Sequence, residues 1–416
     1  MRIFLLECKK ALTSPILIAL LIIFSAFNIF VIFSSSDHKD ELTMVNEIID
    51  QYGREITTDS LVQFEKDIQN DLSTLTLIIG QQYDSIYDFL GEIHYEEREL
   101  YSDEEWEFFN RLQLKEMYYS MADSIDERYA NIHVKEAGEG DVQKYGISDE
   151  AAETLLKENE KFAERFEEMV ANEEHKEWFF AGKPYFMHSF LFKTVFLHII
   201  IESLLLIVLS TAFITTYEFE NRTQLVTYAT PRGRQLMKDK LVASLAISAV
   251  ISVLLFAITL GTYFTVFDYS HVWKTSISSA FNWENNFPYV AWWDLSVGEF
   301  LIGVTILVFI AQMLFAGVTF ALSVVMKNSY ITFFLVAILF VLGWLLPSFM
   351  PKSSNLLFVS SYTLPTLLLA ISNSFMGSSG LILFQNFEWV TISCWTIITI
   401  VLCIGSYKRF TKIDIQ

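Results

Sequence analysis

The stretch "PILIALLIIFSAFNIFVIF" (residues 15–33) has no charged side chain, and its only polar side chains are those of Ser25 and Asn28. A helix needs roughly 20 consecutive apolar residues to cross the hydrocarbon core of a bilayer. The stretch therefore predicts a membrane-spanning helix, with lipid as the solvent of this part of the chain.

Five more stretches have a similar length and hydropathy. They are residues 190–216, 241–267, 300–326, 330–346 and 389–405. The chain has 416 residues, of which 52% are hydrophobic, yet 49 are acidic, so apolar and acidic residues must be segregated along it. We expect an all-α membrane protein with six transmembrane helices.

The first apolar stretch has an alternative interpretation. Arg2, Lys9 and Lys10 precede it, as basic residues precede the apolar part of a cleaved signal peptide. That apolar part is roughly 7 to 15 residues long in signal peptides, and no Ala-x-Ala site follows here. We therefore interpret residues 15–36 as the first transmembrane helix, preceded by an amphipathic interfacial helix over residues 1–14.

A seventh apolar stretch, residues 356–371, is interrupted by Ser360, Ser361 and Pro365. It lies close in sequence to the apolar stretches on either side. We expect residues 351–387 to form a re-entrant or interfacial outer segment before the last span, with its backbone shielded by protein.

The distribution of lysine and arginine predicts the orientation. Residues outside 37–189 include 15 of these basic residues, and 12 of them share one side of the membrane if both termini lie on that side. Cytoplasmic loops carry an excess of Lys and Arg, so we expect cytoplasmic termini in a bacterial cell membrane and a cytoplasmic loop over residues 217–240. The outward-facing segment 268–299 is rich in aromatic residues that suit an interfacial belt: Trp273, Phe281, Trp283, Phe287, Tyr289, Trp292 and Trp293.

Residues 37–189 would form a large outer domain. This segment carries 38 acidic and 14 basic residues and no cysteine, so helix packing without disulfides must hold it together. About 150 residues are enough for a domain with its own core. The acidic residues are interpreted first as a solvated helical surface, with recruitment of cationic species as the alternative.

Apolar periodicity predicts that this domain is helical and elongated. Apolar residues recur over 61–90 with an eleven-residue period, which favours one long helix from Ser60 to Leu100 that begins with a capping box of Ser60 and Gln63.

Two more helical patterns follow in the same domain. A second capping box, Ser102 with Glu105, opens another helix, and a third apolar pattern covers residues 155–170. Residues 136–148, "EAGEGDVQKYGIS", read as a hinge or loop between them.

Motifs of common enzyme classes are absent from the sequence. It contains no G-x-x-x-x-G-K-[ST] phosphate loop, no H-E-x-x-H and no G-x-S-x-G, and its seven histidines show no recognised metal-ligand spacing. We expect a chain that is not an enzyme and that binds no nucleotide, cofactor, metal or nucleic acid itself.

Ionisable residues inside predicted spans are energetically costly and therefore informative. His198 and Glu202 are four residues apart on one face of the second span. They could bond a neighbouring helix, contact a substrate or relay a proton, or contribute to a metal site, for which two ligands are too few. Gln312, midway along the fourth span, raises the same choice between packing and a translocation pathway.

The order of these features resembles the permeases of the type-2 ATP-binding-cassette exporter family. At the N-terminus, Glu7, Lys9, Lys10 and Pro15 match the acidic-then-basic amphipathic helix of that family. The family also has an acidic residue at the end of span two, a small helix, a turn with proline and arginine, and a lysine that begins span three. Those positions correspond here to Glu220, Pro231, Arg234 and Lys240.

The resemblance implies that residues 222–230 form a coupling helix that docks on a separate ATPase subunit. Implied coupling residues are Glu220, Arg222, Gln224, Leu225, Tyr228, Pro231, Arg232 and Arg234. Of these, Gln224, Leu225 and Tyr228 would present the docking surface, and Arg232 and Arg234 would reach acidic groups or lipid phosphates. Two departures from the family are Thr223, where many members have a glycine, and the large outer domain.

The same resemblance implies export powered by ATP and Mg²⁺ on the partner ATPase. Two copies of this chain, or this chain and a related permease, would move an amphiphilic cargo outward past Pro365. Antimicrobial or signalling peptides, lipid-linked molecules and hydrophobic drugs are the implied cargo classes. The alternative from a different class is a non-transporting membrane sensor whose acidic domain captures cationic peptides.

Overall fold

The computed structural model describes residues 2–36, 39–181, 188–229, 231–284, 287–377 and 380–412, and these are almost entirely helical. Six helices among the described residues are long and apolar enough to cross a membrane, as predicted. They are Pro15–Ser34, Ser189–Glu220, Arg232–Val266, Val297–Met326, Ser329–Phe349 and Phe387–Lys412. The chain is therefore a multi-pass membrane protein.

The helical bundle contains these candidate spans and the short elements that join them. In chain order it contains α1 (Arg2–Leu12), α2 (Pro15–Ser34), η3 (Ser189–Val195), α10 (Phe196–Glu220), α11 (Gln224–Tyr228), α12 (Pro231–Val266), α13 (Val297–Met326), α14 (Ser329–Leu345), η4 (Leu346–Phe349), α15 (Leu356–Val359), α16 (Leu364–Leu369), η5 (Ile371–Asn373), η6 (Gly380–Ile382) and α17 (Phe387–Lys412). The most extensive helix–helix packing in the bundle is that of α10 against α12 and α13, and that of α13 against α17.

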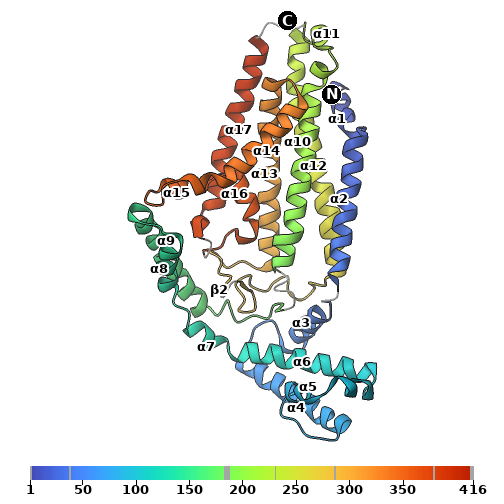
Figure 1. The fold of residues 1–416 in the computed structure, drawn as a ribbon, viewed down its shortest axis with the longest axis vertical. Helices are drawn as coiled ribbons and strands as arrows, with labels where there is room; N and C mark the ends of the chain where they lie inside the picture. Colours follow the sequence, from blue (N-terminus) through green and yellow to red (C-terminus); the bar gives the residue numbers. More distant parts are fainter. Residues whose placement is uncertain are drawn as a thin grey trace.

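A second set of helices, which we call the distal domain (described residues 39–181), follows α2. It contains α3 (Lys39–Tyr52), α4 (Thr58–Ile79), α5 (Ile86–Glu92), η2 (Tyr95–Leu100), α6 (Asp103–Asp123), α7 (Ile125–Ala130), α8 (Val134–Tyr145) and α9 (Asp149–Ala171). Figure 1 shows this domain as an arc across one end of the bundle. Both chain ends and α11 lie at the opposite end, which we call the terminal end (Figure 1).

The predicted single helix over residues 60–100 is wrong. Helix α4 begins one turn earlier than expected, because the Thr57 hydroxyl accepts from the Ser60 amide and the Ser60 hydroxyl accepts from the Thr57 amide, which completes a capping box. It ends at Gly80, whose φ of 79° suits a residue without a Cβ. The apolar periodicity continues past Gly80, but the helix ends there.

The predicted hinge at residues 136–148 is also wrong in its first part. Residues Val134–Tyr145 form α8, which packs against α9 as a helical hairpin and ends at Gly146 with φ 64°. The Asn159 side chain of α9 donates to the Val134 carbonyl at 2.9 Å.

The predicted capping box of Ser102 and Glu105 is confirmed at the start of α6, and the apolar pattern over residues 155–170 lies within α9.

The distal domain does not have a core of its own. Most of its buried apolar residues form one cluster with the distal ends of the spans and with the irregular segment between α12 and α13. That segment includes the short antiparallel pair β1 (Trp283–Glu284) and β2 (Phe287–Pro288). Ile147, Ala151 and Leu155 form a smaller cluster with Leu357, Phe358 and Leu383 of the bundle. The domain and the bundle are therefore stabilised by the same buried surface.

Aromatic residues of this segment support the joint core rather than a lipid-facing belt. Phe281 is 1% exposed and its ring centroid lies 5.6 Å from that of Tyr118 and 5.5 Å from that of Trp178. Trp292 packs 5.7 Å from Phe162 of α9. The expectation of an interfacial belt is thus corrected for these side chains, because the distal domain covers them.

A buried ion pair connects α9 to the same segment. The Arg165 guanidinium donates to both carboxylate oxygens of Glu174, at 2.9 and 2.5 Å, and its Nε donates to the Ala291 carbonyl at 3.1 Å. Both side chains are 7% exposed. Burying two charges is tolerable here because each is paired and hydrogen-bonded.

The third span begins earlier than predicted, because α12 is continuous from Pro231 to Val266. The expected turn with proline and arginine is therefore the first turn of this helix.

Residues 356–371 form α15, α16 and the start of η5, and α16 packs against α14 and α17. Entry of this segment into the bilayer stays a prediction.

His175 should make the protein less stable in mild acid. Its ring is 1% exposed and lies 4.3 Å from that of Tyr129, and burial, followed by repulsion from Lys176, lowers its pKa to about 4. An unfolded chain protonates histidine near its ordinary pKa of about 6.5, so the free energy of unfolding should fall as pH falls from about 6.5 to 4. Burial lowers the pKa of His188 as well, to about 3, so one substitution removes only part of this dependence.

The test compares the melting temperature of the purified full chain in detergent at about pH 7 with that at about pH 5. Tryptophan fluorescence monitors the unfolding. His175→Gln should reduce the difference between the two pH values. His133→Gln, at an exposed position, is the matched control and should leave it unchanged. An equal difference in both variants would contradict this assignment.

Candidate functional site

Four charged side chains meet inside the terminal end of the bundle, and we call them the charge cluster: Glu7, Lys10, Glu218 and Lys240. Lys240 is fully buried, and Glu7 and Glu218 are 4% and 5% exposed. They come from α1, α10 and α12, the three helices that pack together at this end. A lysine with no exposed surface is energetically costly unless its charge is matched.

Each lysine of the charge cluster contacts both carboxylates. The Lys240 ammonium lies 2.5 Å from Glu218 and 3.4 Å from Glu7, and it also donates to the Ile214 carbonyl. The Lys10 ammonium lies 2.8 Å from Glu7 and 2.9 Å from Glu218, over the ring of Tyr217. Two positive and two negative charges therefore neutralise one another away from water.

The amphipathic pattern of α1 explains how it reaches this cluster. Glu7 and Lys10 are three residues apart and so share one helix face. Leu5, Leu6 and Leu12 are 55–59% exposed on the rest of the helix surface. The charged face of α1 thus packs against α10 and α12 while apolar side chains stay exposed, and the location of α1 at a membrane surface stays a prediction.

The short helix α11 is tied to the charge cluster by Tyr228. Its hydroxyl donates to Glu218 at 3.0 Å, and its ring packs 5.0 Å from Phe410 and 5.5 Å from Phe219. Tyr228 is fully buried, so the expectation that it presents a docking surface does not hold. Leu225 and Val226 of the same helix are 56% and 85% exposed.

The protonation states of the groups outside the spans suit this arrangement. Burial acts to lower the pKa of Lys10, but hydrogen bonds to Glu7 and Glu218 outweigh it, so the pKa is raised. Burial, and then the charge of Glu218, raises the pKa of Tyr228. Lys10 therefore stays charged and Tyr228 stays a hydrogen-bond donor at neutral pH.

Other predicted coupling residues are spread around α11. Glu220, predicted as a coupling residue, accepts from the Ser329 amide at 2.6 Å, at the first residue of α14, whose N-cap is Asn328. Arg222 is exposed, with a φ of 56° in the turn before α11. Gln224 is the first residue of α11, which ends at Tyr228; Thr230 lies outside the described residues.

The predicted basic residues lie on the first turns of α12, which starts at Pro231. Arg232 is an exposed residue that interacts with Gln235 at 3.2 Å and Asp239 at 3.5 Å of its own helix. Arg234 donates to the Thr411 carbonyl of α17 at 2.5 Å. One arginine thus stays at the surface, and the other holds two spans together.

Deeper in the bundle, the predicted pair of His198 and Glu202 does not form a hydrogen bond in the structure. Glu202 is 6% exposed and accepts from the Asn28 amide of α2 at 2.7 Å, and the same amide donates to Thr259 of α12 at 3.1 Å. The His198 ring packs 5.2 Å from that of Phe27. Asn28 of α2 therefore joins α10 and α12 through one amide group.

Gln312 joins three helices in a similar way. Its amide nitrogen donates to Ser203 of α10, and its amide oxygen accepts from Ser252 of α12, each at 2.5 Å. All three side chains are fully buried. These contacts favour the packing role for Gln312.

Pro365, the predicted exit residue, is buried in α16 against α14. A Cβ placed on Gly343 would lie 3.1 Å from the Pro365 ring. The close fit lets the neighbouring Thr363 hydroxyl donate to the Gly343 carbonyl at 3.2 Å.

Comparison of the chain with family models, with curated proteins and with solved structures finds no match. Within the described residues, no group of three or more His, Cys, Asp or Glu side chains could hold a metal ion. The assignment of the site therefore depends on its geometry.

Glu218 belongs to the charge cluster, but the sequence interpretation did not single it out. That interpretation selected Glu220, two residues later. A helix-period signal was present, because Ile207, Thr211, Ile214 and Glu218 follow one another at intervals of three or four residues. All four are buried on α10. The position of Glu218 on this buried helix face indicates that it pairs inside the bundle. Its distance from the end of the span carries no such information.

Removing one charge of the cluster should be far more damaging than removing an opposite pair. Lys240→Met or Glu218→Gln leaves an uncompensated buried charge, which typically costs about 3–5 kcal/mol. The double variant leaves Glu7 and Lys10 as a neutral pair. Its free energy of unfolding should therefore fall by clearly less than the sum of the decreases in the two single variants.

Thermal unfolding of the purified variants measures this coupling as a double-mutant cycle. Lys408→Met, at an exposed position of α17, is the matched control and should stay within about 0.5 kcal/mol of the parent. Strictly additive losses would show that Lys240 and Glu218 act independently.

Proposed function

We propose that this chain is the membrane-spanning permease subunit of an ATP-binding-cassette exporter, with α11 as the coupling helix. The observation that carries the proposal is the two-sided character of α11. Leu225 and Val226 project from it, whereas Tyr228 anchors it to Glu218 of the charge cluster. An exposed apolar pair on a firmly anchored short helix suits a protein docking surface.

The charge cluster would transmit motion from that surface. A displacement of α11 acts through Tyr228 on Glu218, and Glu218 contacts Lys10 of α1 and Lys240 of α12. The buried contacts of three helices thus depend on the position of one short helix. Closure of a docked ATPase pair on ATP would in this way shift the spans between inward and outward states.

Orientation and assembly follow from the same proposal. The terminal end would be cytoplasmic, in agreement with its excess of lysine and arginine, and the distal domain would lie outside the cell membrane. ATP and Mg²⁺ would bind the partner ATPase, and a second permease copy or a related chain would complete the transporter. The proposed cargo is a hydrophobic or amphiphilic molecule moved outward.

The test is affinity purification of the full chain from its native membrane in mild detergent, with identification of copurifying proteins by mass spectrometry. An ATP-binding subunit at near-equal stoichiometry is expected. Val226→Asp and Leu225→Asp should lower its recovery by roughly tenfold or more, because a charge would replace apolar contacts at the centre of the interface.

Leu77→Asp is the matched control, since Leu77 is 84% exposed in the distal domain, far along the chain from α11. It should leave recovery unchanged. Absence of any nucleotide-binding subunit, with the chain intact and folded, would overturn the proposal and favour a non-transporting sensor of cationic peptides.

A further inference from the structure

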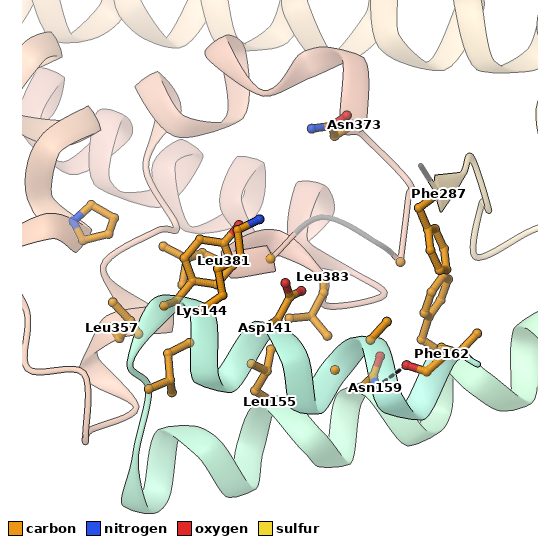
Figure 2. Close-up of a pocket in the computed structure, with 18 of the residues that line it drawn as sticks. Asp141, Lys144, Leu155, Asn159, Phe162, Phe287, Leu357, Asn373, Leu381 and Leu383 are labelled. Atoms are coloured by element: carbon orange, nitrogen blue, oxygen red, sulfur yellow. Dashed lines mark hydrogen bonds between the residues drawn. The ribbon is translucent and has the colours of Figure 1, made fainter. Parts of the chain in front are cut away.

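A cavity of about 710 Å³ separates the α8–α9 hairpin from the distal ends of the spans. This volume is within the range of about 300–1,000 Å³ that small-molecule sites occupy. Its walls come from α8 and α9 on one side and from β2, η4, α15, η5 and η6 on the other (Figure 2). The cavity thus lies between the distal domain and the bundle.

One part of the cavity wall is apolar. Phe162 of α9 and Phe287 of β2 lie together at one end, and Leu381 and Leu383 lie opposite the hairpin (Figure 2). Phe162 and Leu383 are 2% and 4% exposed and belong to the packed core, so this surface is preformed. An acyl chain or a similar hydrocarbon group would be removed from water there.

The charged groups of the described lining are mostly basic. Lys144, Lys193 and Lys352 line the cavity together with one carboxylate, that of Asp141. Burial raises the pKa of Asp141, and the nearby charge of Lys144 opposes this shift. Figure 2 shows Lys144 at the end of the cavity away from Phe162 and Phe287, with Leu357 and Leu381 near it.

Lys352 also fixes the shape of the basic end. Its ammonium donates to the Tyr145 carbonyl at the C-terminus of α8 at 2.6 Å, and its own carbonyl accepts from the Ser148 amide at 3.1 Å. Asn355 donates to Glu150 at 2.9 Å just beyond. The hairpin and the segment after η4 are therefore held at a set separation around the cavity.

The position of the cavity matches the boundary of a bilayer. Lys193 lies in the first turns of the candidate span Ser189–Glu220, and Pro347 and Ser348 lie at the end of the candidate span Ser329–Phe349. Phe349, Leu356 and Val359, near the rim in sequence, are 55–69% exposed. A ligand with a long apolar tail could pass between this surface and the cavity.

We infer that this cavity binds an anionic amphiphile, a molecule with a hydrocarbon tail and one carboxylate or phosphate head, such as a fatty acid or an acidic lipid. The lysines would attract the head, and the wall of Phe162, Phe287, Leu381 and Leu383 would hold the tail. A cationic peptide, which the acidic composition of the whole domain suggests, would meet repulsion inside the cavity. The inference does not require ATPase docking, so it can fail or hold separately from the proposed function.

The experiment is equilibrium binding of radiolabelled oleic acid to the full chain in a non-ionic detergent. Oleyl phosphate should compete as well as unlabelled oleic acid, and oleyl alcohol and oleylamine should compete at least tenfold less well. Octanoate should be weaker than oleate because its tail buries less hydrocarbon. Phosphatidylglycerol in nanodiscs tests whether an acidic lipid shares the site.

Lys144→Gln and Lys193→Gln should each weaken oleate binding by roughly tenfold, because a hydrogen bond between charged groups contributes on that order. Both positions are exposed, so neither variant should disturb folding, which the melting temperature checks. Lys135→Gln, an exposed lysine of α8 outside the cavity lining, is the matched control and should bind oleate as the parent does.

Three results would overturn the inference. Equal competition by oleyl alcohol or oleylamine would show that the negative charge is not recognised. Competition by inorganic phosphate alone would show that the apolar wall is not used. Unchanged binding by both lysine variants, or equal weakening by Lys135→Gln, would place the amphiphile elsewhere.

Discussion

The neutralisation of Lys240 inside the bundle is the constraint on which the terminal end depends. Its ammonium has no exposed surface, so it needs carboxylate partners within hydrogen-bonding distance. Glu218 supplies one from α10 and Glu7 supplies another from α1, with Lys10 balancing the total charge. The positions of α1, α10 and α12 are therefore set relative to one another, and α11 is added through Tyr228.

Similar polar contacts recur along the length of the bundle. Glu202 with Asn28 joins α2 to α10, and Gln312 joins α13 to α10 and α12. Between helices in lipid, apolar side chains gain little by leaving a hydrocarbon solvent, so packing and interhelical hydrogen bonds decide which faces meet. In the distal domain, Arg165 pairs with Glu174 and also donates to the Ala291 carbonyl, which connects that domain to the segment between α12 and α13.

The two sites that we propose lie at opposite ends of one continuous helix. Lys193 lines the cavity near its distal end, and Glu218 belongs to the charge cluster near its terminal end. Any change in the position of this helix alters both sites together, since helices in packed bundles move as rigid elements. An amphiphile in the cavity and a partner on α11 would thus act on the same element of the fold.

The number of spans, the helical class of the distal domain and the amphipathic character of α1 could all be predicted from the amino-acid sequence, because uninterrupted hydropathy and apolar periodicity are local properties of the chain. It also located the start of α6 through a capping box, whereas a short helix within residues 222–230 was expected only from the resemblance to a permease family. Helix continuity past Gly80 and the helix at 134–145 were misjudged, because a left-handed glycine and packing on α9 override periodicity. Three features could be seen only in the folded chain, since each depends on helices distant in sequence coming into contact: Glu218 pairs with Lys240, Tyr228 faces inward, and lysines line the cavity.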